Sequence, residues 1–168
     1  DNRRQRQMCI RDRYKVMKNW YLVYCNVKNS RRDVLIRFLN SFEVEVFNPI
    51  MTYYKARKDR PGKFRKQTKS LFSNYMFIQF DCTKISFSKF DNIEGISYFL
   101  RSSGQIATIP EHLIENLRLS QAMLPKSVLS PCDANVSLGH AMLTHTNEEE
   151  KIRCLKLALE SYQRQPSL

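Results

Sequence analysis

The stretch from Leu71 to Phe80 alternates in a way that predicts a β-strand with apolar groups on both faces. Successive side chains of an extended chain point to opposite sides. One face then carries Phe72, Asn74, Met76, Ile78 and Phe80, and the other carries Leu71, Ser73, Tyr75, Phe77 and Gln79. Two interpretations stay open: the strand is covered on both sides by the protein's own core, or Tyr75 and Phe77 form an exposed patch for a partner.

The pattern around this strand predicts a βαββαβα-like α+β domain. Further strands are expected at 20–25, 44–47, 51–54, 96–100 and 106–109, and helices at 31–41, 86–92 and 110–123. Ser30 is expected to cap the first helix, and Pro110 suits the start of the last one. The apolar stripe of the first helix is Val34, Leu35, Phe38, Leu39 and Phe42. Arg31, Arg32 and Arg37 are therefore expected to face outward.

Composition shifts divide the chain into four parts. Residues 1–16 are an Arg-rich leader without helical or strand period, expected to be disordered, and Met17 opens the folded domain, which extends to residue 123. Residues 124–146 are predicted to be a linker that begins rich in proline and serine. Residues 147–168 contain an amphipathic helix at 148–163 that Asn147 caps, with an apolar stripe of Ile152, Leu155, Leu159 and Tyr162.

Charge adds a candidate partner. The 168 residues carry 28 Lys and Arg against 16 Asp and Glu, a formal charge of +12, which indicates a polyanionic partner such as nucleic acid. Eight of these cations and one acid fall between Lys55 and Lys69, where Pro61-Gly62 predicts a turn at a hairpin tip. This tract is either a solvated, mobile loop or a contact for nucleic acid or polymerase.

The sequence also favours a reducing, aqueous compartment. Five widely spaced cysteines without a Cys-x-x-Cys pair indicate free thiols. No apolar run approaches the roughly 18 residues of a membrane span, and the leader lacks the apolar core of a signal peptide. We therefore expect a cytoplasmic protein that has no membrane partner, and nothing in the sequence demands more than a monomer.

Catalysis is not expected. The three histidines stand in no motif with a serine or cysteine nucleophile, and four glycines do not make a Gly-rich phosphate loop. Cys132, His140, His145 and Cys154 are of types that bind zinc, but their spacing matches no common finger. We expect no catalytic residue, no metal and no cofactor.

Several segments between Met17 and Met123 together resemble the NusG-like transcription elongation factors. They are Asn19-Trp20-Tyr21-Leu22-Val23-Tyr24-Cys25, Pro49, Leu71-Phe72-Ser73-Asn74-Tyr75-Met76-Phe77, Gly95-Ile96-Ser97-Tyr98-Phe99-Leu100-Arg101 and Ile109-Pro110. Within this family they are most similar to the specialised antiterminators typified by RfaH and its conjugative-plasmid relatives such as ActX. The family usually has proline where Ser73 stands, a departure expected to loosen the turn into the strand.

The resemblance implies a NusG N-terminal-type domain, an antiparallel sheet flanked by helices, that binds bacterial RNA polymerase across its cleft. Tyr24, Tyr75, Phe77 and Ile114 match the positions that dock on the clamp helices of the largest subunit. Ser86-Phe87-Ser88 match the loop that reaches the opposing polymerase lobe. Bridging both sides would hold the clamp closed and suppress pausing and termination.

The resemblance also implies contact with the non-template DNA strand at the start of the first helix. The matching residues are Asn26, Asn29 and Arg32, with Lys28 and Lys89 nearby. Asn26 and Glu94 stand where the RfaH-type members have basic residues, and a carboxylate cannot attract phosphate. The DNA signal is therefore expected to differ from that of RfaH.

The C-terminal tail departs most from the family. A KOW barrel needs several glycines, and residues 124–168 contain only Gly139, so a complete barrel is not expected. The helix 148–163 resembles the latter half of the helical hairpin that masks the polymerase site in RfaH. The resemblance implies that Ile152, Leu155 and Leu159 cover Tyr75 and Phe77 until polymerase displaces them.

Two other functions stay open from the sequence. One is a single-stranded RNA-binding module that stacks bases on Tyr75 and Phe77 beside the basic hairpin. The other is a truncated competitor that occupies the clamp helices and displaces the general NusG factor without antiterminating.

Overall fold

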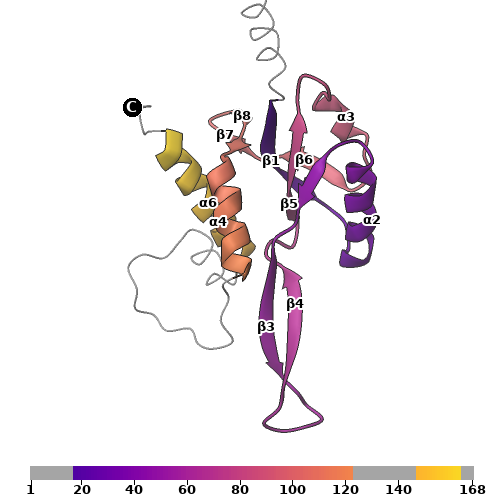
Figure 1. Ribbon diagram of the computed structural model, residues 1–168, viewed down its shortest axis with the longest axis vertical. Helices are drawn as coiled ribbons and strands as arrows, with labels where there is room; N and C mark the ends of the chain where they lie inside the picture. The colour runs from indigo at the N-terminus through magenta and orange to yellow at the C-terminus, as the bar shows by residue number, and fades with distance from the viewer. Residues whose placement is uncertain (1–16, 123–146, 164–168) are drawn as a thin grey trace, which may run out of the picture.

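The computed structural model describes residues 17–122 and 147–163, and its centre is an antiparallel sheet (Figure 1). The strands lie in the order β2–β5–β1–β6, and β9 also pairs with β1. Their bounds are Glu45–Phe47 (β2), Tyr75–Asp81 (β5), Lys18–Cys25 (β1), Ile96–Phe99 (β6) and Thr108–Ile109 (β9). Each of these pairings is antiparallel, which confirms the fold class expected from the sequence.

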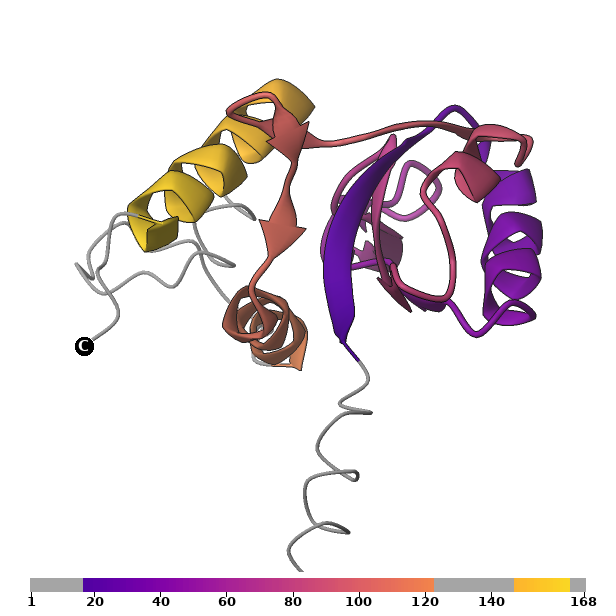
Figure 2. The same cartoon turned by 90° about the horizontal axis from the view of Figure 1, so that it is seen from above.

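Helices cover both faces of the sheet and give the molecule three layers (Figure 2). The helices α2 (Asn29–Asn40) and α3 (Ser88–Asp91) lie on one face, and α4 (Glu111–Ala122) and α6 (Glu148–Gln163) lie on the other. Alternation along β5 serves both layers, because Met76, Ile78 and Phe80 pack on the α2 side and Phe77 packs on the α4 side. The strand is thus covered on both sides, and Phe77 is not exposed.

The buried face of α2 differs from the predicted stripe. Leu35 and Leu39 are buried as expected, but Val34 and Phe38 are 61% and 45% exposed. The inward face instead includes Arg32, which is only 2% exposed, so the expectation that Arg32 faces outward is wrong. Residues 32, 35 and 39 follow helical spacing, which means that the true stripe is rotated by about one residue from the all-apolar one.

The start of α2 also corrects a detail. The helix begins at Asn29, and Lys28 stands at its cap position without a side-chain hydrogen bond. Ser30 therefore lies inside the first turn and is not the cap that the sequence suggested.

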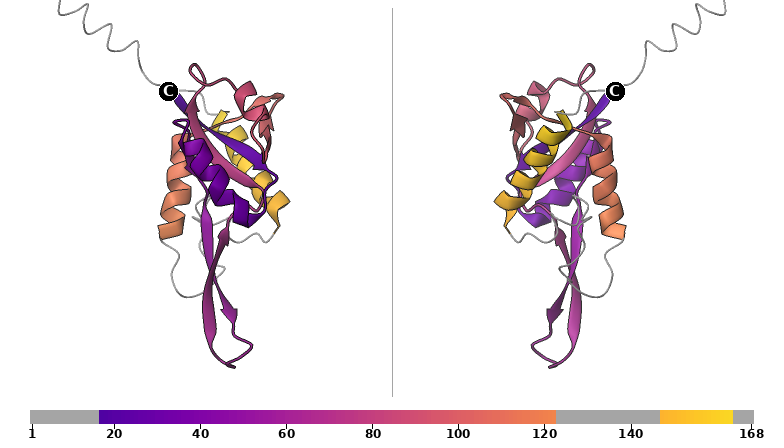
Figure 3. Two further views of the ribbon diagram at one scale, coloured as in Figure 1. Left: turned by 90° about the vertical axis from the view of Figure 1, so that its right-hand side faces the viewer. Right: turned by 90° about the vertical axis from the view of Figure 1, so that its left-hand side faces the viewer.

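The basic tract forms a hairpin and not a loose loop. It pairs β3 (Ile50–Ala56) with β4 (Phe64–Ser70) as a separate two-stranded sheet, and the chain turns at Gly62 with φ of +78°. Figure 3 shows from both sides that this hairpin projects away from the three layers. A second small ribbon pairs β7 (Arg101–Ser102) with β8 (Gln105–Ile106), so the strand expected at 106–109 is split between β8 and β9.

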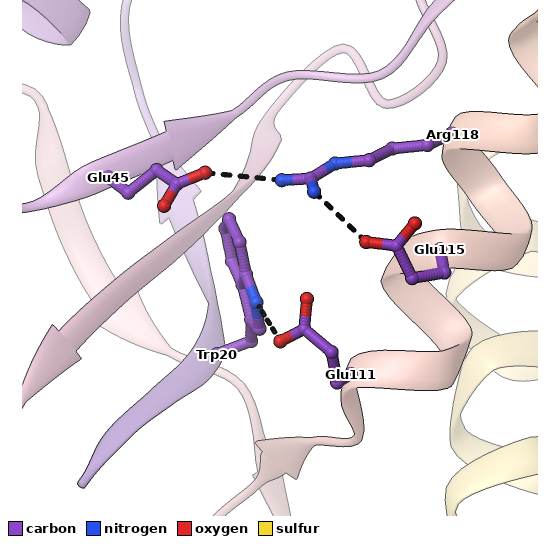
Figure 4. Close-up of polar contacts among 5 residues, drawn as sticks. All are labelled: Trp20, Glu45, Glu111, Glu115 and Arg118. Carbon is purple, nitrogen blue, oxygen red and sulfur yellow. Dashed lines mark hydrogen bonds and ion pairs between the residues drawn. The ribbon is translucent and has the colours of Figure 1, made fainter. Parts of the chain in front are cut away.

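Polar contacts fasten α4 to the edge of the sheet (Figure 4). The indole Nε1 of Trp20 donates to Glu111 Oε2 at 2.7 Å. Arg118 forms ion pairs with Glu45 on β2, at 3.2 Å, and with Glu115 one turn earlier, at 3.1 Å. Its guanidinium also lies 5.5 Å from the centre of the Trp20 ring. These contacts hold the α4 residues that pack on Phe77 in a fixed position.

The C-terminal helix has the predicted bounds and the predicted cap. Asn147 Oδ1 accepts a hydrogen bond from the Glu149 backbone N–H at 3.1 Å. The predicted inward stripe of α6 is confirmed for Ile152, Leu155 and Leu159, which are buried. Tyr162, predicted to belong to it, is 50% exposed.

Some predictions concern residues outside the described ranges. These are the leader 1–16, the linker 124–146, residues 123 and 164–168, and three of the four candidate zinc ligands, Cys132, His140 and His145. Within residues 17–122 and 147–163, no helix is both long enough and apolar enough to cross a membrane.

Two cysteines offer a test of whether the core packed on the central sheet is shielded from solvent. Cys25 is fully buried, and burial raises the pKa of its thiol to about 12, whereas Cys82 is exposed. Because the thiolate is the reactive form, we expect iodoacetamide at pH 8 to modify Cys82 and to spare Cys25 in the folded protein. Peptide mass spectrometry measures both sites, and urea should make both reactive. Equal labelling of both cysteines in native buffer would contradict the burial of Cys25 in the core.

Candidate functional site

The four residues expected to dock on polymerase converge in the structure. We call Tyr24, Tyr75, Phe77 and Ile114 the docking cluster. Tyr24 and Tyr75 are cross-strand partners on β1 and β5, and their ring centres are 5.1 Å apart. Phe77 lies two residues further along the same face of β5, and Ile114 reaches it from α4 within one hydrophobic core. Regular alternation on β5 and helical spacing on α4 are enough to bring these side chains together.

The docking cluster has an exposed end and a buried end. Tyr24 and Tyr75 are half-buried, whereas Phe77 and Ile114 are both 0% exposed. Tyr75 packs against the core that contains Phe77 and so connects the two ends. Only the tyrosine end is therefore open to a partner while the protein keeps this arrangement.

A third tyrosine completes the open end, and the sequence analysis did not assign it a role. The Tyr98 ring stacks on Tyr24 with centres 4.9 Å apart and an angle of 4° between the planes, and its side chain is 48% exposed. Its hydroxyl lies 3.1 Å from that of Tyr75. Burial, together with this hydrogen bond, raises the pKa of the Tyr75 hydroxyl. The signal was present, because Tyr98 falls within a segment that carries the family resemblance.

The helix α6 covers the buried end of the docking cluster. Ile152, Leu155 and Leu159 belong to the same hydrophobic core as Phe77 and Ile114. Figure 2 shows α6 beside α4, on the sheet face opposite α2. A cavity of about 480 Å³ follows the edge of this contact between Tyr24 and Tyr75 on one side and α6 on the other. The three apolar residues of α6 thus close the buried end of the docking cluster to solvent.

Two polar side chains fasten the first turn of α6 to the segment before β5. The Glu148 carboxylate accepts from the Asn74 backbone N–H at 2.8 Å and from Asn74 Nδ2 at 3.1 Å. Lys151 Nζ donates to the Leu71 carbonyl at 2.7 Å and is only 4% exposed. Burial, with Lys69 adding to the effect, lowers the pKa of Lys151. Sequence patterns could not indicate either contact, since both depend on tertiary placement.

The predicted lobe-contact loop presents two hydroxyls. Ser86 and Ser88 are exposed, and their Oγ atoms are 3.0 Å apart. Phe87 between them is half-buried, and its ring packs edge-on against Tyr21 with centres 5.1 Å apart. The aromatic anchor therefore fixes the loop while the serines face solvent, at the opposite end of the molecule from the basic hairpin (Figure 1).

The predicted DNA-binding residues are only partly brought together. Asn26 and Lys28 are exposed and line a cavity of about 870 Å³ between the start of α2 and the loop before β6. Asn29 follows Lys28 as the first residue of α2. Lys89 lies elsewhere, on α3, with its Nζ 4.8 Å from the centre of the Phe42 ring. Asn26 and Lys28 thus share one surface at the start of α2, and Lys89 stands on a neighbouring element.

Arg32 has a structural position instead of a DNA-facing one. Its Nη1 donates to the Ser73 carbonyl at 2.5 Å, and its Nη2 donates to the Tyr75 carbonyl. Burial lowers the pKa of this guanidinium. Arg31 points outward in its place and pairs with Glu94 at 3.6 Å, both side chains being well exposed. We therefore remove Arg32 from the candidate DNA-binding set.

Nothing in the described part of the chain offers a metal centre, because no three His, Cys, Asp or Glu side chains lie close enough there to share an ion. An aromatic cluster, a covering helix, a serine loop and a cavity with polar and apolar lining make up an arrangement that suits binding.

A comparison with known protein families supports this interpretation. Residues 18–118, well over half of the chain, match the NusG family, described as transcription termination factor NusG. The matched region contains the whole sheet, the basic hairpin and the docking cluster, and it ends before α6. The chain therefore belongs to the NusG family, whose members are transcription regulators that bind RNA polymerase and act on elongation and termination.

Proposed function

We propose that this protein is a specialised elongation and antitermination factor of the RfaH and ActX type, which binds RNA polymerase through the docking cluster once α6 has moved away. The observation that carries the proposal is the shared core of Phe77, Ile114 and the three apolar residues of α6. A helix that fills a site only partly open to solvent is what a masked binding surface requires. The family match supports polymerase as the partner.

The proposed contact is driven by apolar burial. The clamp helices of the largest polymerase subunit would replace α6 on Phe77 and Ile114 and pack on Tyr24 and Tyr75. Each large side chain buried in such an interface contributes about 1.5 to 3 kcal/mol. Part of this free energy is needed to displace α6, because a ligand shifts an equilibrium only by its differential affinity for the two states.

Two further contacts belong to the proposal. The exposed hydroxyls of Ser86 and Ser88 would meet the opposing polymerase lobe, so that the factor holds both sides of the cleft and disfavours paused states. Asn26, Lys28 and Asn29, with Lys89, would read the non-template DNA strand by hydrogen bonds and phosphate attraction. Glu94, which pairs with Arg31 beside this surface, supports a DNA signal different from that of RfaH.

The proposed domain organisation is a NusG N-terminal-type domain with a helical tail. The described part of that tail is α6, and no barrel is closed in the described ranges. The protein would act as a monomer, with polymerase and the non-template strand as its partners.

The first test is Tyr75→Ala. We expect it to lower the affinity for an isolated clamp-helix fragment at least about tenfold, because the substitution removes a ring from the open end of the docking cluster. Biolayer interferometry measures this affinity. Tyr54→Ala, which removes a tyrosine that is 47% exposed on the basic hairpin, is the matched control and should bind normally.

The same variant separates the other functions. The stacked pair of half-buried Tyr24 and exposed Tyr98 is the feature that favours a single-stranded RNA-binding module, since such rings can stack on bases. If Tyr75→Ala loses RNA affinity and keeps affinity for the clamp helices, the RNA-binding function replaces our proposal. Transcription across a terminator distinguishes the truncated competitor, which would bind polymerase without increasing run-through.

A further inference from the structure

The basic hairpin, Ile50–Ser70, stands apart from the rest of the protein. Among residues 17–122 and 147–163, its two strands pair with each other and form no backbone pairing with the central sheet. Phe64 is 65% exposed and Tyr54 is 47% exposed, so these two large side chains of the hairpin are not used in a core. Isolated two-stranded ribbons are marginal in water and usually gain from a partner.

The charge of the hairpin is almost all positive. Its single carboxylate between residues 55 and 69, Asp59, is held by Arg57 through hydrogen bonds of 3.0 and 2.5 Å. The neighbouring cations Lys55, Lys58, Arg60, Lys63, Arg65 and Lys66 are exposed. Within the described ranges, none of these six forms an ion pair with a carboxylate.

The register of the strands places like charges opposite each other. Lys55 pairs with Arg65 across the ribbon, on the face that also carries Gln67. Lys66 lies on the other face, opposite Tyr54 and two residues along the same strand from Phe64. Like charges directly across a strand pair are destabilising, and a nearby polyanion relieves that repulsion. Cations on both faces indicate a partner that presents phosphates on two sides.

We propose that the basic hairpin is a binding arm for duplex DNA that lies in the major groove. A two-stranded ribbon fits the width of that groove, and its two faces then meet the phosphates of both flanking strands. Seven residues in each strand make the ribbon about 23 Å long. The deep and narrow major groove of A-form RNA does not admit such a ribbon, so the arm prefers DNA. The proposal is independent of polymerase binding and of the non-template strand surface.

The test is the triple variant Lys55→Gln, Arg65→Gln and Lys66→Gln in the full chain. Fluorescence anisotropy with a labelled 30-bp duplex measures affinity across a series of salt concentrations. The matched control is Lys18→Gln, Lys84→Gln and Arg101→Gln, which removes the same charge from exposed positions outside the hairpin. Circular dichroism confirms that both variants are folded, and residues 1–16 are present in each.

The hairpin variant is expected to bind the duplex at least about tenfold more weakly than the control. The slope of log affinity against log salt should become shallower by roughly 0.9 for each phosphate that the arm no longer neutralises. Equal weakening of both variants would overturn the proposal, because it would show an effect of net charge alone. Tighter binding of duplex RNA than of duplex DNA by the unmodified protein would overturn it as well. Since polymerase is absent, none of these results bears on the docking cluster.

Discussion

Replacing Leu155 with aspartate is expected to increase the affinity of the protein for the polymerase clamp helices by at least about tenfold. Leu155 is 0% exposed and packs in the core shared with Phe77 and Ile114. A carboxylate at this position would be desolvated without a partner, which costs several kcal/mol. Helix α6 would therefore leave the sheet and uncover the docking cluster. A tenfold gain in affinity requires only that the substitution remove about 1.4 kcal/mol from the free energy with which α6 docks on the sheet.

The measurement is biolayer interferometry with the clamp-helix fragment, combined with hydrogen exchange at residues 148–163. Exchange in α6 should accelerate while the central strands remain protected, which shows that the domain is still folded. Leu157→Asp is the matched control, because Leu157 is on the same helix and 57% exposed. If α6 is released in Leu155→Asp and the affinity stays unchanged, α6 does not mask the polymerase site.

The Arg32→Met substitution is expected to lower the free energy of unfolding by about 2 to 5 kcal/mol. Methionine fills part of the space but cannot donate to the carbonyls of Ser73 and Tyr75, which lose their part-buried hydrogen bonds to Arg32. An unsatisfied buried carbonyl costs about 1 to 3 kcal/mol. Urea denaturation followed by circular dichroism measures the change.

Arg37→Met is the control for this substitution. Arg37 is exposed on the same helix, so its replacement should change stability by no more than about 0.5 kcal/mol. A stable Arg32→Met protein with impaired DNA binding would contradict the structural role and restore Arg32 to the DNA-binding set.

Periodicity was sufficient within β5 and for most of the α6 stripe, but it put Phe72 on the wrong face, because β5 begins only at Tyr75, and it wrongly counted Tyr162 as buried. The alternation along β5 correctly separated Met76, Ile78 and Phe80 from Phe77, and helical spacing located α6 with its cap at Asn147. Periodicity failed on α2, because an apolar stripe was sought and the buried face contains Arg32. Arg32 can be buried because two backbone carbonyls accept its hydrogen bonds. These carbonyls lie more than forty residues away in the chain, so the local sequence of α2 does not reveal them.

The candidate site also has features that the sequence predicts and features that it does not. The resemblance to a known family named four docking residues, and alternation with helical spacing accounts for their convergence. Their accessibility was not predictable, because it depends on whether α6 is docked. The contacts of Glu148 with Asn74 and of Lys151 with Leu71 join segments that are distant in the sequence, and charged residues at the start of a helix are ordinarily solvated.

The short segment from Ser73 to Tyr75 is held from both sides of the sheet. Arg32 on α2 donates hydrogen bonds to the carbonyls of Ser73 and Tyr75, while the Glu148 carboxylate on α6 accepts one from the Asn74 N–H. Departure of α6 thus frees the N–H of the Ser73–Asn74 peptide group, while the C=O of the same group stays bonded to Arg32 in the opposite layer. A single peptide group thus links the two layers, and a change on one face of the protein has a direct covalent route to the other.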